Sequence, residues 1–405
     1  MHSKGIGRVL IAIVMVSCVQ AQQTIGPWDR TTLYCTPQVY DAAEYATNDV
    51  KTVFYEGEPY HGKPTRIFAY YGVPEAKPGA KVPGIVLIHG GGGSAFVRWV
   101  KLWNARGYAA ISMDTCGAIS GNVFGNEQSK HQRHSWAGPA GWGGFDQLDD
   151  PIKDQWTYHA VAAVVRGHSL LRSLPGVDPD RIGVTGISWG GYLTCIVAGV
   201  DDRFTFAVPV YGCGFLREDS AWTETLKKMK KSSADKWEEL WDPSSYLPLA
   251  RAPFLWVTGS NDFAYHLPNL QKSYRALKVP YTLAVRLRMP HGHGAVGEKP
   301  AEILSFADQM TRKGAPLPRI TQVTREDRHV HLTFECPVSR VVAQAELNVT
   351  SDRGAWKERK WTSLPVTLDS CTGVVTADIP ESATVYYINL FVEDGQVVSS
   401  VHEEL

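Results

Sequence analysis

The pentapeptide Gly-Ile-Ser-Trp-Gly at residues 186–190 constrains the fold more than any other feature of the sequence. A run typical of a β-strand precedes it at 181–185, and an apolar run of helical character follows at 192–198. A serine at such a junction is typical of a sharp, strained strand-to-helix turn, where flanking glycines avoid steric clashes and the hydroxyl projects clear of the sheet. Ser188 is therefore the candidate nucleophile. An ordinary glycine-rich turn could also contain this pentapeptide. A nucleophilic role for Ser188 therefore requires an acid, a base and oxyanion donors elsewhere in the sequence.

Charge and hydropathy exclude several classes of partner. The 405 residues carry 41 acidic and 41 basic side chains without a long run of like charge, which argues against nucleic acid and anionic membranes. Residues 1–21 combine basic residues, a short apolar run and small residues, so we expect a cleaved signal peptide and a secreted or periplasmic protein. Lipid attachment at Cys18 is an alternative, although Met15 suits that processing poorly. The sequence predicts no transmembrane segment.

The hydrophobic pattern divides the chain in two. From about 66 to 313, short apolar runs alternate with helical patterns, which predicts a mostly parallel sheet covered by helices. Residues 319–405 alternate apolar and polar side chains, which predicts an antiparallel β-sandwich. We therefore expect an α/β catalytic domain over 22–316, with an N-terminal extension at 22–60, and a β-sandwich domain over 319–405.

Two long segments, 116–150 and 213–249, interrupt the α/β pattern. Long loops of this kind are usually functional, and in such a fold they lie over the carboxyl ends of the strands, where ligands bind. In the C-terminal domain, Cys336 and Cys371 are the only cysteines beyond residue 213. We therefore predict a disulfide between them within the sandwich, which an oxidising compartment permits, and two separate thiols are the alternative.

Partners for the serine follow it in the chain. Asp262 comes just after the predicted strand 254–258, and a carboxylate there points toward the ligand-binding edge of a parallel sheet. It is the candidate acid, although capping of the next helix would also explain it. The next strand leads into Pro-His-Gly-His-Gly at 290–294. We expect His293 to be the base, because it lies further beyond the strand between two glycines, while His291 is the alternative.

Candidate oxyanion donors precede the serine. The apolar run 85–88 leads into His-Gly-Gly-Gly-Gly at 89–93, where glycines let backbone N–H groups approach a substrate carbonyl. We expect Gly91 and Gly92 to donate, together with the N–H of Trp189. A phosphate-binding loop would need a Lys-Ser/Thr after the glycines, which is absent. No cysteine or histidine spacing points to a metal, and no cofactor is expected.

These motifs resemble the α/β-hydrolase superfamily, and within it the prolyl-oligopeptidase and acetyl-xylan-esterase-like branch, over about residues 60–313. The resemblance rests on His89–Gly92, Gly186–Tyr192, Asp201–Phe204, Gly259–Asp262 and Gly292–Gly294. It implies an α/β-hydrolase fold, Asp262 as the triad acid and His293 as the base. Peptidase members of the branch carry a large N-terminal propeller, for which this chain has neither the length nor the repeats.

The resemblance implies a secreted serine esterase that deacylates carbohydrate esters, such as acetylated xylan fragments, through an acyl-enzyme. Its substrate would be a small-molecule or oligosaccharide ester. Flat aromatic rings can stack on the apolar faces of sugars, so the candidate substrate-binding residues are Trp136, Trp142, Phe145 and Trp222. The alternative is that these side chains only pack the long loops against the core. Two other functions remain: an aminopeptidase or acylaminoacyl-peptidase-like hydrolase, and a catalytically inactive carbohydrate-binding protein.

Overall fold

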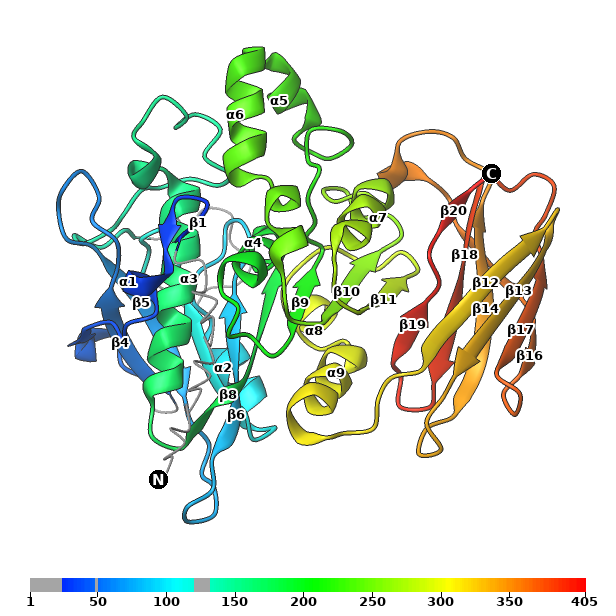
Figure 1. The fold of residues 1–405 in the computed structure, drawn as a ribbon, viewed down its shortest axis with the longest axis horizontal. Coiled ribbons are helices and arrows are strands. Elements are labelled where there is room, and N and C mark those ends of the chain that lie inside the picture. Colours follow the sequence, from blue (N-terminus) through cyan, green and yellow to red (C-terminus); the bar gives the residue numbers. More distant parts are fainter. Residues whose placement is uncertain (1–23, 48–49, 120–131) are drawn as a thin grey trace, which may run out of the picture.

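The computed structural model describes residues 24–47, 50–119 and 132–405. The predicted signal peptide and Cys18 lie outside these residues. Figure 1 shows an α/β part, residues 24–312, beside a group of antiparallel strands formed by residues 319–404, here called the C-terminal sheets.

A nine-stranded sheet forms the centre of the α/β part. Its strand order is β11-β10-β9-β8-β6-β7-β5-β4-β3, and the six strands from β11 to β7 run parallel to one another. The strands are β3 (Val39–Asp41), β4 (Lys51–Glu56), β5 (Arg66–Gly72), β6 (Val82–Ile88), β7 (Ala109–Met113), β8 (Val177–Ile187), β9 (Ala207–Val210), β10 (Phe254–Gly259) and β11 (Tyr281–Arg286). The predicted N-terminal extension contributes β3 and β4, which pair antiparallel at one edge.

Helices cover this sheet, as the apolar strands predict. Strands β7 and β10 are buried along their whole length, so neither face of them meets solvent. The helices are α2 (Val97–Asn104), α3 (Trp156–Ser173), α4 (Trp189–Val200), α7 (Leu267–Ala276), α8 (Ala295–Glu298) and α9 (Ala301–Arg312). A short hairpin of β1 (Thr24–Ile25) and β2 (Trp28–Asp29) leads into α1 (Arg30–Leu33). The α/β-hydrolase-type arrangement is thereby confirmed. In the part of the chain that the structure describes, no helix is long and apolar enough to cross a membrane.

The two long segments meet each other above the sheet. Segment 213–249 forms α5 (Thr223–Lys228) and α6 (Lys231–Trp241), which project from the body of the molecule (Figure 1). The indole of Trp237 donates to the carbonyl of Gly143, and the indole of Trp241 donates to Gln155, both over 2.6–2.7 Å. Both rings are fully buried, so Trp237 joins the two segments, and Trp241 fixes segment 213–249 to the residue that precedes α3.

The C-terminal sheets are antiparallel throughout. One has the order β12-β13-β17-β16, and the other has the order β15-β14-β18-β19, with β20 also paired to β18. Their strands are β12 (Arg319–Glu326), β13 (His329–Glu335), β14 (Val342–Thr350), β15 (Thr362–Pro365), β16 (Thr367–Asp369), β17 (Val374–Asp378), β18 (Val385–Val392), β19 (Val397–Ser399) and β20 (Glu403–Glu404). A separate apolar core lies between them, as in a β-sandwich. Cys336 and Cys371 are separate thiols, so the predicted disulfide is absent from this structure.

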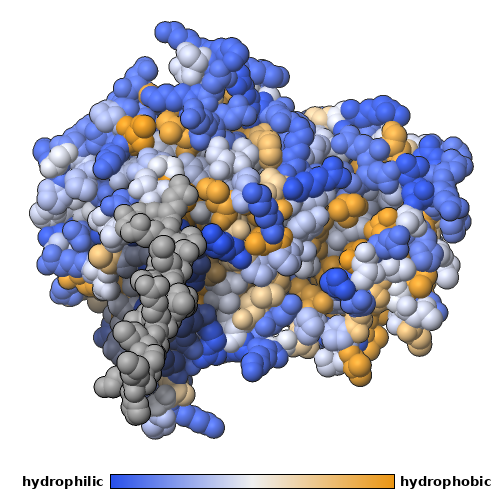
Figure 2. Space-filling view, viewed as in Figure 1, coloured by the Kyte–Doolittle hydropathy of each residue, from blue (hydrophilic) through white to orange (hydrophobic). Residues whose placement is uncertain are grey.

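The C-terminal sheets close one edge of the main sheet. Ser399 Oγ accepts the N–H of Val285 over 2.7 Å, and Asn389 Nδ2 donates to the carbonyl of Val285 over 3.1 Å. These contacts satisfy main-chain groups of the edge strand β11, which would otherwise offer a site for edge-to-edge association. The buried side chains of Trp361 and Tyr387 belong to the same apolar core as the α/β part. Figure 2 shows apolar residues along this boundary, whereas the α5–α6 projection is mostly hydrophilic.

Candidate active site

Ser188 occupies the strained turn that its sequence predicts. It joins β8 to α4 with φ 60° and ψ −118°, a backbone conformation that a non-glycine residue rarely adopts. The flanking glycines are sterically required. A Cβ on Gly186 would lie 2.1 Å from the carbonyl oxygen of Gly190, and a Cβ on Gly190 would lie 2.0 Å from that of Ile88. Strain of this kind is common where a side chain must be held in one functional direction.

The glycine loop after β6 lies beside Ser188. A Cβ placed on Gly90 would be 3.0 Å from the Cβ of Ser188, and one on Gly91 would be 2.8 Å from the Trp189 ring. Gly92 has φ 69°, which favours glycine. Trp189 begins α4, so its N–H has no acceptor within the helix. The structure therefore brings the glycine loop, with the predicted oxyanion donors Gly91 and Gly92, beside the turn that carries the third predicted donor, Trp189.

The Asp262 side chain is held by the turn after β10 and is 3% exposed. Its Oδ1 accepts the N–H groups of Ala264 and Tyr265, over 2.9 and 2.7 Å. Its Oδ2 lies 2.6 Å from Nδ1 of His291. An ionised carboxylate oxygen only accepts, so Nδ1 carries the imidazole proton and Nε2 of His291 is left as an acceptor. The carboxylate thus fixes both the orientation and the tautomer of His291.

The predicted pairing of Asp262 with His293 is wrong. Nε2 of His293 accepts the N–H of Gly90 over 2.9 Å, and its Nδ1 lies 3.2 Å from Oε1 of Glu298. A backbone N–H only donates, so Nδ1 carries the proton of this ring and donates it to Glu298. His293 pairs with Glu298 and not with Asp262 because of helix α8. This helix begins at Ala295 and ends at Glu298, and so brings a carboxylate to His293.

The surroundings of His293 favour a neutral ring. It is packed against Phe96 and Trp99, with ring centroids 4.8 and 5.7 Å away. Burial lowers the pKa of His293, although the bond to Glu298 and its charge act in the opposite direction. Burial also raises the pKa of Glu298, but its bond to His293 and the charge of Arg98 bring that pKa below its usual value. A neutral His293 keeps the lone pair that accepts from Gly90.

Hydrogen bonds hold both the N–H and the carbonyl oxygen of Gly90. Its N–H donates to His293, while its carbonyl oxygen lies 2.9 Å from Nδ1 of His89 and 3.1 Å from the N–H of Gly93. Nε2 of His89 accepts the N–H of Thr115 over 3.0 Å, so Nδ1 of His89 is the protonated nitrogen and donates to Gly90. The two histidines fix the start of the glycine loop beside Ser188.

Three aromatic side chains that the sequence did not single out surround His291. The rings of Tyr211 and Phe263 lie 4.5 and 4.7 Å away, and that of Tyr265 lies 6.5 Å away. The hydroxyl of Tyr211 donates to the carbonyl of Pro290 over 2.8 Å and so holds the histidine loop. Phe263 is 54% exposed. Its position next to Asp262 in the sequence was the signal that could have identified it.

Most of the predicted aromatic residues gather around Trp189. The ring of Trp222 lies 4.6 Å from that of Trp189, and the ring of Phe145 lies 6.1 Å from it. Trp142 lies edge-to-face against His89 at 5.6 Å. Trp136 lies elsewhere: its ring is 4.1 Å from the Arg66 guanidinium, at the β3–β5 end of the sheet. The structure therefore brings three of the four predicted aromatic residues to the site.

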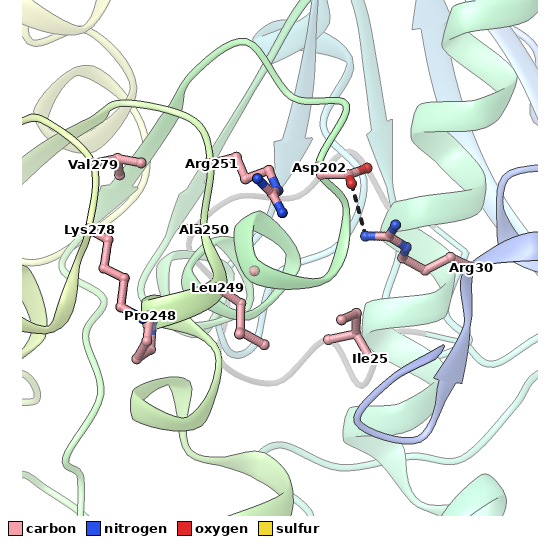
Figure 3. Close-up of a pocket in the computed structure, with 10 residues that line it drawn as sticks. Ile25, Arg30, Asp202, Pro248, Leu249, Ala250, Arg251, Lys278 and Val279 are labelled. Atoms are coloured by element: carbon pink, nitrogen blue, oxygen red, sulfur yellow. Dashed lines mark hydrogen bonds and ion pairs between the residues drawn. The ribbon is translucent and has the colours of Figure 1, made fainter. Parts of the chain in front are cut away.

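A pocket of about 460 Å³ lies away from Ser188. It opens near the far end of α4, where Gly199 lines it, about 15 Å along the helix from Trp189. Figure 3 shows Arg30 joined to Asp202 by an ion pair of 3.0 Å on one side, and Arg251 and Lys278 on another. This pocket is separate from the candidate active site.

Comparison with known proteins identifies relatives of the α/β part. Residues 141–314 match the sequence model of the prolyl oligopeptidase family. The uncharacterized peptidase YuxL of Bacillus subtilis (strain 168) is 25% identical over 213 residues. That match covers 48% of this chain and 28% of YuxL, so the chain spans less than a third of that relative's length.

Two acetyl xylan esterases share the fold. One, from a Paenibacillus species, has a TM-score of 0.52 and 20% identity, and the match covers 69% of this chain and 92% of that chain. The other, acetyl xylan esterase 1 from a Thermoanaerobacterium species, has a TM-score of 0.51 and 16% identity. That match covers 69% of this chain and 88% of the esterase. Identities this low show the fold alone. The chain thus has an α/β-hydrolase-type fold, and its residues 141–314 are similar to the prolyl oligopeptidase family.

Proposed function

We propose that the protein is a serine esterase that removes small acyl groups from carbohydrate esters. In this proposal Ser188 is the nucleophile, His291 is the general base and Asp262 is the acid that orients it. The observation that carries the proposal is the 2.6 Å contact between His291 Nδ1 and Asp262 Oδ2, on the loops that follow β11 and β10. This contact leaves Nε2 of His291 able to accept a proton from a serine hydroxyl.

The reaction proceeds through an acyl-enzyme. Ser188 Oγ attacks the ester carbonyl carbon while His291 Nε2 takes the hydroxyl proton. The carbonyl oxygen becomes an oxyanion that accepts the N–H groups of Gly91 and Trp189, with Gly92 beside them. The carbon–oxygen bond to the sugar then breaks, and His291 returns the proton to the leaving alkoxide. A water molecule, deprotonated by His291, hydrolyses the acyl-serine and restores both side chains.

The site also supports a role for His293 that differs from base catalysis. In this proposal His293 holds Gly90, and thereby sets the direction of the next N–H groups in the glycine loop. Its Nε2 is occupied by the Gly90 N–H at 2.9 Å, so accepting a proton from Ser188 would require breaking that bond. His293 is therefore proposed as a positioning residue for the oxyanion donors.

Aromatic rings beside Ser188 support a carbohydrate substrate. Trp142, Phe145 and Trp222 lie around the glycine loop and Trp189, and exposed Phe263 lies against His291. Flat rings can cover the apolar faces of sugars, and two neighbours with this fold are acetyl xylan esterases. Export from the cytoplasm is also part of the proposal and rests on the composition of residues 1–21.

The family match favours one alternative, a peptidase. An ester has a good alkoxide leaving group, whereas an amide requires firm protonation of a poor leaving nitrogen. A panel of acetylated oligosaccharides and aminoacyl or N-acylaminoacyl anilides separates the two, with Ser188→Ala protein as the blank. We expect the acetyl esters to be cleaved much faster. Faster cleavage of the anilides would favour the peptidase, and binding without any turnover would favour an inactive carbohydrate-binding protein.

A further inference from the structure

A loop of the C-terminal sheets reaches the turn that carries Asp262. The loop connects β14 to β15, and its residues 356–361 are here called the bracing loop. Asn261, which directly precedes Asp262, donates its Nδ2 to carbonyl oxygens of this loop. These are the carbonyls of Trp356 and Lys357, both at 3.3 Å, and Arg359, at 2.6 Å.

The same loop also holds the chain that leads to His291. Arg288 lies three residues before His291, and its Nη1 donates to the carbonyl of Trp361 over 2.8 Å. The N–H of Arg288 donates to Ser260 Oγ over 2.9 Å, and that hydroxyl donates to Asn261 Oδ1 over 3.0 Å. The acid turn and the histidine loop are thus bonded to each other and to the bracing loop.

The bracing loop is itself firmly anchored. Its terminal residues, Trp356 and Trp361, are 5% and 2% exposed and belong to the apolar core of the α/β part. The Trp361 ring packs against Tyr387 of β18 at 5.3 Å, and the Arg359 guanidinium lies 3.7 Å above the Trp356 ring. A loop fixed at both ends presents its carbonyl groups in one arrangement, so it can determine where its partners lie.

We propose that the C-terminal sheets contribute to catalysis, because their bracing loop sets the separation between Asp262 and His291. Asn261 and Arg288 are the positioning residues through which it acts. The inference rests on the proposed roles of Asp262 and His291. The two catalytic loops follow different strands, β10 and β11, so their contact depends on how those loops are held. A freely attached glycan-binding module would have no reason to bind both loops.

The test is Asn261→Ala in the full chain, assayed with p-nitrophenyl acetate. We expect kcat to fall by about 10- to 100-fold with little change in KM, because a small misplacement of a catalytic group costs that much. Asn261→Leu, which keeps the shape and removes the amide donor without adding a charge, should show the same change.

The matched control is Gln271→Ala. Gln271 also donates a side-chain amide to a carbonyl of the C-terminal sheets, that of His402 at 2.9 Å, but it lies on α7 outside the acid turn. We expect Gln271→Ala to lower Tm to a similar extent as Asn261→Ala and to leave kcat and KM unchanged. Arg288→Met tests the bracing loop independently if Asn261→Ala does not fold, and it should reproduce the losses in kcat.

A wild-type kcat in the Asn261 and Arg288 variants would overturn the inference, and so would an equal loss of kcat in Gln271→Ala. Failure of the proposed function looks different. In that case Ser188→Ala would retain activity, whatever the Asn261 variants do.

Discussion

The N–H of Gly90 donates to Nε2 of His293 over 2.9 Å, and this bond separates the roles of two histidines that lie two positions apart. His291 contacts the acid Asp262, whereas His293 contacts the loop that would bind the oxyanion. In the proposed mechanism, His291 therefore moves the proton, whereas His293 holds the loop whose N–H groups stabilise the developing charge.

Substitutions of His293 distinguish these roles. His293→Ala should lower kcat by about 10- to 100-fold, since the glycine loop loses a contact that places its N–H groups. His293→Gln should recover part of that loss, because the amide oxygen can accept from Gly90 in place of Nε2. His291→Gln should remain as inactive as His291→Ala, since an amide cannot take the serine proton. Steady-state kinetics of the four variants, with Tm as the folding control, checks this. Equal inactivity of His293→Gln and His293→Ala would instead identify His293 as the general base.

Buried histidines should make folding stability fall at mildly acidic pH. Burial lowers the pKa of His134, His159 and His402 from 6.5 to about 4. Because the unfolded chain binds these protons at a higher pH than the folded chain, the stability they contribute is complete above pH 6.5 and is lost between pH 6.5 and 4. Tm measured at pH 7.5, 6.0, 5.0 and 4.5 should decrease through that window.

His402→Gln provides the comparison for this prediction, since an amide does not titrate. The variant should show a shallower dependence of unfolding free energy on pH, by at most about 1.4 kcal/mol per pH unit. An unchanged slope, or a constant Tm between pH 6.5 and 4.5, would contradict the explanation.

The aromatic residues around Trp189 should matter for large substrates. Trp142→Ala should weaken turnover of acetylated oligosaccharides by about 10-fold, which corresponds to the loss of one ring contact, and affect p-nitrophenyl acetate much less. Trp136→Ala is the matched control, because that tryptophan stacks on Arg66 away from the site and is 42% exposed. It should leave both rates unchanged. Equal losses on the two substrates in Trp142→Ala would point to a packing role.

Local steric rules made much of the site predictable. The turn at Ser188 needs glycine at 186 and 190 because main-chain atoms occupy the space of a Cβ, and this requirement is visible in five consecutive residues. Alternating apolar runs likewise predicted the main sheet, and period-two alternation predicted the C-terminal sheets, because burial sets both patterns.

The remainder depended on contacts between distant residues. The choice between His291 and His293 is set by Gly90, about two hundred positions earlier, and by Glu298 on a short helix that no motif indicated. Trp136 was expected at the site from its neighbours in the sequence, but Arg66 holds it elsewhere. The bonds from Asn261 to the bracing loop join residues nearly one hundred positions apart, which no local pattern can indicate.

The most direct test of the central claim, that Asp262 and His291 activate Ser188, is the rate at which a fluorophosphonate labels the native protein, with the modified residue located by peptide mass spectrometry. The activated hydroxyl attacks phosphorus, so the label should be found on Ser188 and should be absent from Ser188→Ala. Labelling should slow by at least about 100-fold in His291→Ala and much less in His293→Ala. A label on another residue, or labelling that survives in His291→Ala and disappears in His293→Ala, would contradict the account.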